Sequence, residues 1–528
     1  MYFRVTAEQQ TLLTKKHTIH LFIKETMIEL ILNEERYEND IRALLMAFYH
    51  GEKIFVRKTE NAGGSGKGTD QEKVRRILEA IYDENGLKLT LKDEAGRVLR
   101  QSYTEDFPKD HKAGKNCLKT ALYELLCEVT GRTLPWGTLT GIRPTKLPMT
   151  CYDSGYSREE AAEYLRKTYR VSEEKIRLCT QVAANERRIL EGIDAEHSFS
   201  LYVGIPFCPT ICLYCSFSSY PLSVWAKEVD HYLEALFKEI RQVSRMVDKS
   251  CLTTVYMGGG TPTSLNAEQM DRLLCTLEDN FDLSIGREFT IEAGRPDSID
   301  LDKLRVMKNH GIERISINPQ TLNQKTLDVI GRRHTVEDVE RAFDMARQVG
   351  FSNINMDLIL GLPGENSEDV ERTLSGIHQM DPESMTVHSL AVKRASRLNQ
   401  NLELYPPAPQ EEVNRMIDMA WHEAEAMGME PYYLYRQKNM AGNLENVGYA
   451  KPGKECLYNI LIMEEKQSIV AVGAGGSSKI LYPSKNRIER VENVKSVKDY
   501  IERIDEMIDR KHQNFPKYGI FEKKDLKK

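Results

Sequence analysis

The amino-acid sequence predicts an α/β fold whose middle part is a partial (β/α)6 barrel. Strand-like and helical runs alternate six times between about residues 197 and 430. Alternation at this spacing is typical of parallel strands joined by right-handed helical crossovers. Glycine-rich, cysteine-containing and polar segments follow the strand-like runs, and a barrel of this kind carries its functional groups on that rim.

The individual elements of the barrel follow from the order of these runs. The strands are predicted at 200–205, 253–257, 288–292, 313–317, 353–360 and 384–391. The helices are predicted near 224–245, 267–280, 300–309, 336–349, 367–379 and 410–427. Each predicted helix follows a predicted strand, so each pair is read as one βα unit.

We expect two further domains, one before and one after the barrel in the sequence. The barrel is assigned to residues 196–430, an accessory α+β domain to 1–195, and a C-terminal α+β cap over the substrate to 431–528.

Four elements are predicted in the accessory domain. Residues 18–23 are predicted to form a strand, and 71–85 and 115–130 to form amphipathic helices, from apolar residues at three- and four-residue spacing. The charged stretch 157–192 is strongly helical in pattern and is expected to connect this domain to the barrel.

Composition narrows the class of protein. The chain has 528 residues and a formal net charge of −6, which gives no indication of general affinity for nucleic acid. Its ten cysteines are scattered rather than spaced as a disulfide framework, which favours a reducing compartment. The N-terminus has no apolar core of signal-peptide length, and no run reaches the roughly 18 apolar residues of a spanning helix. We therefore expect a cytoplasmic protein without a membrane span.

Two loops of the N-terminal part suggest ligand binding but are better explained otherwise. Residues 61–69 look like a phosphate loop, yet Asn61 replaces its first glycine and Gly68 its serine or threonine, so we favour a surface loop. Further on, Arg143 and Lys146 could receive a carboxylate, but their surroundings are rich in glycine and proline and favour a packed linker.

The most informative stretch is 204–215, directly after the first barrel strand. It holds Cys208, Cys212 and Cys215 at C-x3-C-x2-C spacing. Three thiolates can ligate three irons of a [4Fe–4S] cluster, which leaves the fourth iron open to a small molecule. Zinc or a disulfide set are the alternatives, but zinc usually takes four ligands, typically in two pairs.

Other polar groups are expected on the same rim. A glycine run with Gly259, Gly260 and Thr261 follows the second strand, where a ligand can approach the backbone closely. Glu292 ends the third strand, and Gln320 follows the fourth, with Arg332 at the end of the next turn of chain. Asp357 lies within the fifth strand. Individually each could be a solvated or structural residue; together they suit an amino acid joined to a ribose.

The cysteine stretch resembles the radical S-adenosylmethionine (radical SAM) superfamily, in which an aromatic residue precedes the third cysteine, here Tyr214. The resemblance implies that SAM chelates the open iron through its methionine amino and carboxylate groups. It further implies reductive cleavage of SAM to methionine and a 5′-deoxyadenosyl radical, which abstracts a hydrogen atom from the substrate.

From Tyr202 to about residue 363 the sequence is similar to the oxygen-independent coproporphyrinogen III oxidase family, which includes haem-chaperone relatives. This implies that Tyr202 contacts SAM and that Gly259, Gly260 and Thr261 hold its amino group. The rest of the SAM pocket would be Glu292, Gln320, Arg332 and Asp357. Arg332 would pair with a carboxylate and Asp357 with ribose hydroxyls. Ala391 falls where the family contacts a second SAM.

The N-terminal extension, the Arg143 loop and the C-terminal stretches resemble the HemZ-type branch of this family. Two positions depart from the best-characterised oxidase branch: Gly204 replaces a histidine and Phe217 replaces a fourth cysteine. Aromatic, amide and basic residues at 431–443, 456–459 and 473–479 would suit a flat tetrapyrrole bearing carboxylates, although an ordinary tyrosine-rich core explains them equally well.

The resemblance implies oxidative decarboxylation of two propionates of coproporphyrinogen III to the vinyl groups of protoporphyrinogen IX. A low-potential donor such as flavodoxin or ferredoxin is the expected partner, and we expect a monomer. The alternatives are a haem-binding chaperone of the same family and radical chemistry on another substrate.

Overall fold

The computed structural model describes residues 26–49, 51–59, 73–194, 196–436, 444–482, 487–516 and 519–521. The chain divides into two compact units, Met1–Thr140 with Glu163–Ile176, and Gly141–Ala162 with Arg177–Lys528. The strand predicted at 18–23 and the loop at 61–69 lie outside the described residues. The domain boundaries at 195 and 430 stay predictions.

The smaller unit contains a five-stranded sheet in the order β2-β1-β3-β4-β5. Its strands are β1 (Thr26–Leu32), β2 (Lys53–Lys58), β3 (Lys73–Tyr82), β4 (Gly86–Asp93) and β5 (Val98–Glu105). Helices α2 (Glu38–Phe48) and α3 (His111–Thr130) pack against it through buried side chains such as Leu44 and Leu122. Helix α3 confirms the helix predicted at 115–130, and Asp110 caps its first turn by accepting from the N–H of Ala113.

The helix predicted at 71–85 is wrong, because residues 73–82 form strand β3. Leu78, Ala80 and Tyr82 are buried at every second position, which is the period of a strand. The turn that follows is fixed by Asp83, whose Oδ1 accepts from the N–H groups of Asn85 and Gly86. This turn and the pairing of β3 with β1 and β4 outweigh the local helical spacing.

The stretch predicted as one helical region, 157–192, forms two helices. They are α5 (Arg158–Tyr169) and α6 (Glu173–Leu190), separated at Arg170, whose backbone φ of 57° is left-handed. A left-handed residue ends an α-helix.

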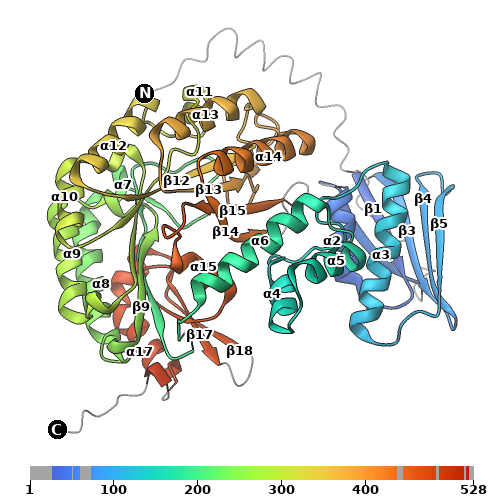
Figure 1. Cartoon of the computed structure of the whole chain (residues 1–528), viewed down its shortest axis with the longest axis horizontal. Helices are drawn as coiled ribbons and strands as arrows, with labels where there is room; N and C mark the ends of the chain where they lie inside the picture. Colours follow the sequence, from blue (N-terminus) through green and yellow to red (C-terminus); the bar gives the residue numbers. More distant parts are fainter. Residues whose placement is uncertain are drawn as a thin grey trace. The chain divides into compact units, whose positions relative to one another are not determined.

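The larger unit is built on an eleven-stranded sheet (Figure 1), in the order β14-β15-β13-β12-β11-β10-β9-β6-β16-β17-β18. Six consecutive strands are mutually parallel and confirm the predicted partial barrel. They are β6 (Phe199–Ile205), β9 (Leu252–Gly259), β10 (Glu288–Gly294), β11 (Arg314–Ile317), β12 (Asn353–Leu360) and β13 (Ser384–Ser389). Their C-terminal ends therefore meet at one edge of the sheet.

Helices follow each of these strands. They are α7 (Leu222–Trp225), α8 (Val229–Val243), α9 (Ala267–Asn280), α10 (Leu301–Asn309), α11 (Gln324–Val329), α12 (Val336–Val349), α13 (Ser367–Met380) and α14 (Gln410–Ala426). The longer ones, such as α8, α9, α10 and α12, lie along the outer face of the sheet (Figure 1). Helices α9, α12 and α13 each begin with a reciprocal capping box, formed by Asn266, Thr335 and Asn366. These caps explain why their starts match the sequence prediction.

The C-terminal segment extends the same sheet at both edges. Strand β16 (Ser468–Val472) pairs in parallel with β6, and β15 (Glu445–Ala450) pairs antiparallel with β13. The other elements of this segment are β14 (Glu430–Arg436), β17 (Ser477–Tyr482), β18 (Arg487–Glu492), α15 (Leu457–Glu464), α16 (Val497–Glu502) and α17 (Ile504–Asn514). The larger unit also contains α4 (Lys146–Asp153), much earlier in the chain. The first barrel strand is therefore an interior strand, flanked by β9 and β16.

A buried polar network joins α8, α17 and the turn after β16. Glu239 and Lys511 are both fully buried, and the Lys511 Nζ lies 2.7 Å from the Glu239 carboxylate and 2.6 Å from Asn493 Oδ1. The same carboxylate accepts from Tyr500 at 2.5 Å and from the Gly473 N–H at 2.8 Å. The network holds the β16 turn against helix α8.

Removing the cation of this network is expected to destabilise the fold strongly. Lys511→Met leaves a buried carboxylate without its counter-charge, so we expect a loss of about 3–5 kcal/mol in the free energy of unfolding by urea titration. Lys498→Met, at an exposed position, is the matched control and should change it by less than about 0.5 kcal/mol. Equal effects of the two substitutions would contradict this account.

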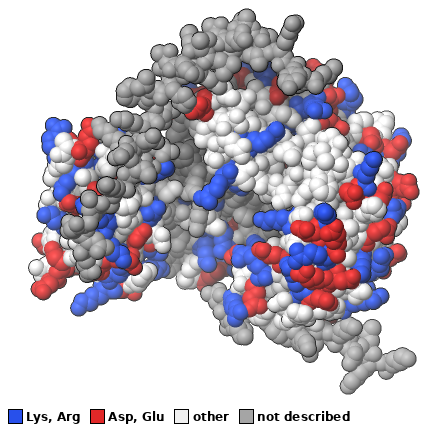
Figure 2. All heavy atoms as spheres, turned by 180° about the vertical axis from the view of Figure 1, so that it is seen from behind, with Lys and Arg blue, Asp and Glu red and all other residues white. Residues whose placement is uncertain are grey.

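None of the described helices is long and apolar enough to cross a membrane. On the face seen in Figure 2, Lys and Arg side chains lie among Asp and Glu side chains, and the larger unit also shows a broad uncharged area. The visible charges therefore do not form a single-sign patch.

Candidate active site

One cavity of about 540 Å³ opens at the C-terminal edge of the parallel strands. Its lining includes all twelve residues that the sequence predicted for the site, namely Tyr202, Cys208, Cys212, Cys215, Gly259, Gly260, Thr261, Glu292, Gln320, Arg332, Asp357 and Ala391. They come from segments up to 189 positions apart (202 to 391), so only the fold brings them together. A volume in this range suits a small-molecule site.

The cysteine loop is held in place by backbone hydrogen bonds to several segments. The two-residue strands Phe207–Cys208 and Tyr220–Pro221 pair in parallel and bracket it. The Leu213 N–H donates to the Ile330 carbonyl oxygen at 2.9 Å, and the Leu213 carbonyl accepts from the Leu398 N–H at 2.9 Å. Burial raises the pKa of the Cys208 thiol, so a bound metal would have to displace its proton.

The spacing of the three thiols disfavours a single zinc ion. The sulfur atoms of the three loop cysteines do not all lie within 4.8 Å of one another. Within the described part of the chain, Asp271, Cys275 and His310 are the group whose possible ligand atoms do. Zinc–sulfur bonds of about 2.3 Å would draw three sulfurs closer than that. A multi-iron cluster is larger and fits thiols that stand further apart.

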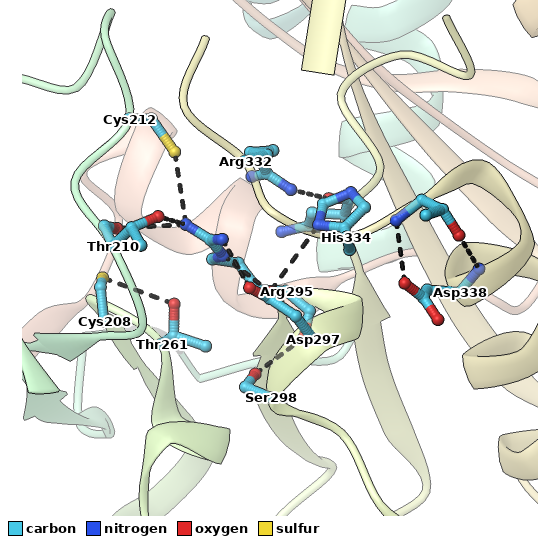
Figure 3. Close-up of polar contacts among 12 residues, drawn as sticks. Cys208, Thr210, Cys212, Thr261, Arg295, Asp297, Ser298, Arg332, His334 and Asp338 are labelled. Atoms are coloured by element: carbon cyan, nitrogen blue, oxygen red, sulfur yellow. Dashed lines mark hydrogen bonds and ion pairs between the residues drawn. The ribbon is translucent and has the colours of Figure 1, made fainter. Parts of the chain in front are cut away.

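The glycine run is packed directly against the cysteine loop. The Gly260 N–H donates to the Ile205 carbonyl and the Thr261 N–H to the Phe207 carbonyl, each at 2.7 Å. A Cβ on Gly260 would lie 2.6 Å from the Phe207 carbonyl oxygen, so only glycine fits. The Thr261 hydroxyl lies 3.5 Å from the Cys208 sulfur (Figure 3). A ligand amino group donates hydrogen bonds, so here it would need acceptors such as carbonyl oxygens of the run or the nearby Glu292 carboxylate.

Gly260→Ala is therefore expected to push the cysteine loop away from the glycine run. We expect iron incorporation on anaerobic reconstitution to fall at least about tenfold, measured as iron and sulfide per chain. Gly141→Ala is the control, because a Cβ at Gly141 meets no atom within 4 Å. Full iron content in Gly260→Ala would show that the loop does not depend on this contact.

Glu292 presents a carboxylate to the cavity beside the glycine run. Burial raises its pKa to about 7, with a further contribution from Asp357, while hydrogen bonds from Tyr256 and the Gly259 amide oppose the rise. The Tyr256 hydroxyl donates to Glu292 Oε1 at 2.5 Å. A Cβ on Gly258 would lie 2.9 Å from the Glu292 carboxyl carbon, so the missing side chain makes room for this carboxylate.

A backbone hydrogen bond joins Gln320 to Asp357 on strand β12. The Gln320 N–H donates to the Asp357 carbonyl at 3.0 Å, and Gln320 has a left-handed φ of 70°, which is unusual for a residue other than glycine. Its side-chain Oε1 is buried without a hydrogen-bond partner among the described residues. Asp357 Oδ1 accepts from Asn355 at 2.7 Å. An orphaned buried acceptor in a cavity wall favours a bound ligand with a donor group.

Two buried arginines lie beside the cysteine loop (Figure 3). Arg332 donates to the Asn318 carbonyl at 2.5 Å and lies 3.4 Å from the Tyr214 hydroxyl. Burial alone would lower the pKa of Arg332, but Tyr214 and Cys212 raise it, so the group stays a cation. The second arginine, Arg295, contacts Thr210 and Cys212. Sequence reasoning missed Arg295, although it stands three residues after Glu292 and directly follows the same strand.

Three stacked tyrosines, Tyr202, Tyr256 and Tyr458, form an aromatic wall that lines the cavity. The sequence did not reveal that these rings stack on one another. The rings of Tyr256 and Tyr458 stack with centroids 4.4 Å apart, and Tyr202 stacks on both at 6.4 Å. Tyr433, Tyr435 and Asn459 line the cavity as well, so two of the three C-terminal stretches singled out in the sequence reach it. Residues 437–443 lie outside the described residues.

Gly204 and Phe217, the two positions that depart from the oxidase branch, differ in their surroundings: Gly204 is closely packed and Phe217 is exposed in the cavity. A Cβ on Gly204 would lie 3.3 Å from the Val472 carbonyl oxygen, because strand β16 packs closely there. Phe217 lines the cavity and is 71% exposed, with the Lys393 ammonium 5.7 Å from its ring centroid. Arg143 bonds the Met463 carbonyl and Glu465, both at 2.8 Å, which agrees with the linker interpretation.

The fold and the cysteine loop define a member of the radical SAM class: the family model described as the radical SAM superfamily matches residues 202–376. The chain is 42% identical to the oxygen-independent coproporphyrinogen-III oxidase-like protein HemZ of Bacillus subtilis, over 89% of this chain and 95% of that protein. It is 35% identical to the haem chaperone HemW of the same organism, over 58% of this chain and 76% of that protein. The chain therefore belongs to the oxygen-independent coproporphyrinogen III oxidase-like family of radical SAM proteins.

A solved structure is also similar, that of coproporphyrinogen III oxidase (HemN) from Escherichia coli, with a TM-score of 0.45 and 23% identity over 62% of this chain and 73% of that chain. Proteins of the radical SAM class carry a [4Fe–4S] cluster and SAM. The residues present fit both groups, because three thiols line the cavity together with the orphaned Gln320 oxygen and the Glu292 carboxylate.

Proposed function

We propose that this protein is an oxygen-independent coproporphyrinogen III dehydrogenase, an oxidoreductase of porphyrin biosynthesis. The observation that carries the proposal is the cavity, in which all twelve predicted residues meet at the C-terminal edge of the parallel strands. Cys208, Cys212 and Cys215 are proposed to hold the cluster, which with SAM supplies hydrogen-atom abstraction when both are bound.

The SAM contacts are proposed for the residues that surround the cysteine loop. Glu292 and the carbonyl oxygens of the glycine run would hold the methionine ammonium, and Arg332 would pair with its carboxylate. Asp357 would accept from ribose hydroxyls. Tyr202 stands beside the glycine run, and its hydroxyl oxygen is 3.0 Å from where a Gly259 Cβ would be. Ala391 is proposed to contact a second SAM.

The rim of the cavity supports a flat substrate that bears carboxylates. Lys393 offers an ammonium and Phe217 an exposed ring, and the tyrosine wall lines the same cavity. An ammonium pairs with a propionate, and aromatic rings pack against a macrocycle. Each propionate would lose a hydrogen atom from its β-carbon, CO2, and one electron to an acceptor. A flavodoxin or ferredoxin is proposed as the electron donor to the cluster.

A second candidate function is haem binding, which the similarity to a haem chaperone suggests. His388 lines the cavity, and burial lowers its pKa and favours the neutral imidazole that can ligate iron. The ring lies 3.4 Å from the Tyr435 hydroxyl and 3.9 Å from Asp357.

An anaerobic assay separates the two functions. The reconstituted protein is mixed with SAM, a reductant and coproporphyrinogen III, and 5′-deoxyadenosine and protoporphyrinogen are followed together; haem titration runs in parallel with wild type and His388→Ala. The dehydrogenase proposal expects both products. Stoichiometric haem binding that is lost in His388→Ala, with the porphyrinogen untouched, would support the chaperone function instead.

A further inference from the structure

We propose that Arg295 is a positioning residue that holds the cysteine loop and raises the reduction potential of the cluster bound there. The proposal rests on the assignment of Cys212 as a cluster ligand. Figure 3 shows the Arg295 guanidinium between Thr210 and Cys212 on one side and Asp297 on the other.

Arg295 is buried and makes specific contacts with the cysteine loop. The residue is 3% exposed, and its Nη1 donates to the Thr210 hydroxyl at 2.6 Å and the Thr210 carbonyl at 3.1 Å. The same Nη1 lies 3.9 Å from the Cys212 sulfur. One guanidinium nitrogen therefore contacts the two loop residues that flank Ile211, and it fixes the loop from within the protein.

Asp297 orients the guanidinium so that its positive end faces the sulfur. The two side chains form a bidentate pair, with Nε to Oδ1 at 2.9 Å and Nη2 to Oδ2 at 2.7 Å. His334 Nδ1 lies 3.7 Å from the same carboxylate. Burial would raise the pKa of Asp297, but its contacts with His334 and Arg295 outweigh this and lower it, so the carboxylate stays ionised.

The pair therefore acts as a dipole aimed at a cluster ligand. Reduction adds one negative charge to a cluster, and a cation or an N–H donor at a ligating sulfur stabilises that charge. In a buried site this stabilisation is poorly screened by water. Arg332 also lies near the same sulfur, so its charge adds to that of Arg295 while SAM is absent. Once Arg332 pairs with the SAM carboxylate, Arg295 is the one of these two cations left to act on the cluster.

The test is potentiometric titration of the reduced cluster, followed by electron paramagnetic resonance without SAM. For Arg295→Gln we expect a more negative midpoint potential, with the reduced-to-oxidised ratio at a fixed potential lowered at least about tenfold. Arg295→Lys keeps the positive charge, so its midpoint potential should lie between those of Arg295→Gln and the wild type. The control is Arg305→Gln, an exposed position on α10, which should leave the potential unchanged.

Asp297→Asn gives a second and opposite arm. Removing the Asp297 carboxylate should make the midpoint potential of the cluster less negative. This measurement tests the proposal even if Arg295→Gln takes up no iron. An unchanged potential in iron-loaded Arg295→Gln, or a more negative one in Asp297→Asn, would overturn the proposal. Iron content is measured on every sample, and absence of iron from the wild type would instead show that the cluster assignment itself is wrong.

Discussion

Replacing Cys212 by alanine is expected to abolish both cluster binding and SAM cleavage. The residue is the middle cysteine of the C-x3-C-x2-C loop, is 8% exposed, lines the cavity and contacts the Arg295 guanidinium. Even changes next to metal ligands lower metal affinity or activity about 10–100-fold, so loss of a ligand should cost more than about 100-fold. Iron per chain and 5′-deoxyadenosine formation are the two measurements.

Cys275→Ala is the matched control for this substitution. Cys275 is an exposed thiol on α9 outside the cavity, so its loss should leave iron content and SAM cleavage unchanged. A Cys212→Ala protein that kept a full complement of iron, or a Cys275→Ala protein that lost it, would show that the cluster is held elsewhere.

Glu292→Gln is expected to stabilise the SAM-free protein while it weakens SAM binding. The Glu292 pKa is raised from 4.5 to about 7, so between these values the native state holds a proton that the unfolded state has lost. Stability of the wild type therefore falls as pH rises from 4.5 to 7, and the full cost is present above pH 7. Glutamine carries no charge, so at pH 8 we expect a gain of about 1–3 kcal/mol in the free energy of unfolding.

The pH dependence separates this effect from simple repacking. At pH 5 the wild-type carboxyl is already neutral, so the difference between the two proteins should shrink towards zero. SAM affinity by calorimetry should fall about 10–100-fold in the variant, because a charge-assisted hydrogen bond to the ammonium is lost. A stability gain that is equal at pH 5 and pH 8, or unchanged SAM affinity, would contradict the role proposed for Glu292.

The barrel and most of its rim could be predicted because each strand, helix and loop there shows its own pattern within a short stretch of sequence. Strands such as β12 and helices such as α9 show their period and caps within one segment, and parallel strands necessarily place the ends that carry Cys208 and Gly260 at one edge. The strand β3 could not be predicted in this way, because its partners β1 and β4 outweigh a locally helical spacing.

The parts of the site that were missed depend on contacts between distant segments. The tyrosine wall joins β6, β9 and α15, and no spacing within one segment reveals that Tyr202, Tyr256 and Tyr458 stack. Arg295 likewise meets Cys212 across 83 positions of sequence. Its only local signal was its place directly after strand β10, three residues beyond Glu292.

We propose that a hydrogen atom is abstracted in this cavity from a propionate β-carbon of coproporphyrinogen III. The most direct measurement is a single anaerobic turnover with substrate deuterated at the propionate β-carbons, followed by mass analysis of 5′-deoxyadenosine. The account predicts deuterium in 5′-deoxyadenosine, together with vinyl groups and CO2, and none of these in Cys212→Ala. Unlabelled 5′-deoxyadenosine beside intact coproporphyrinogen would contradict it and would leave SAM cleavage without this substrate.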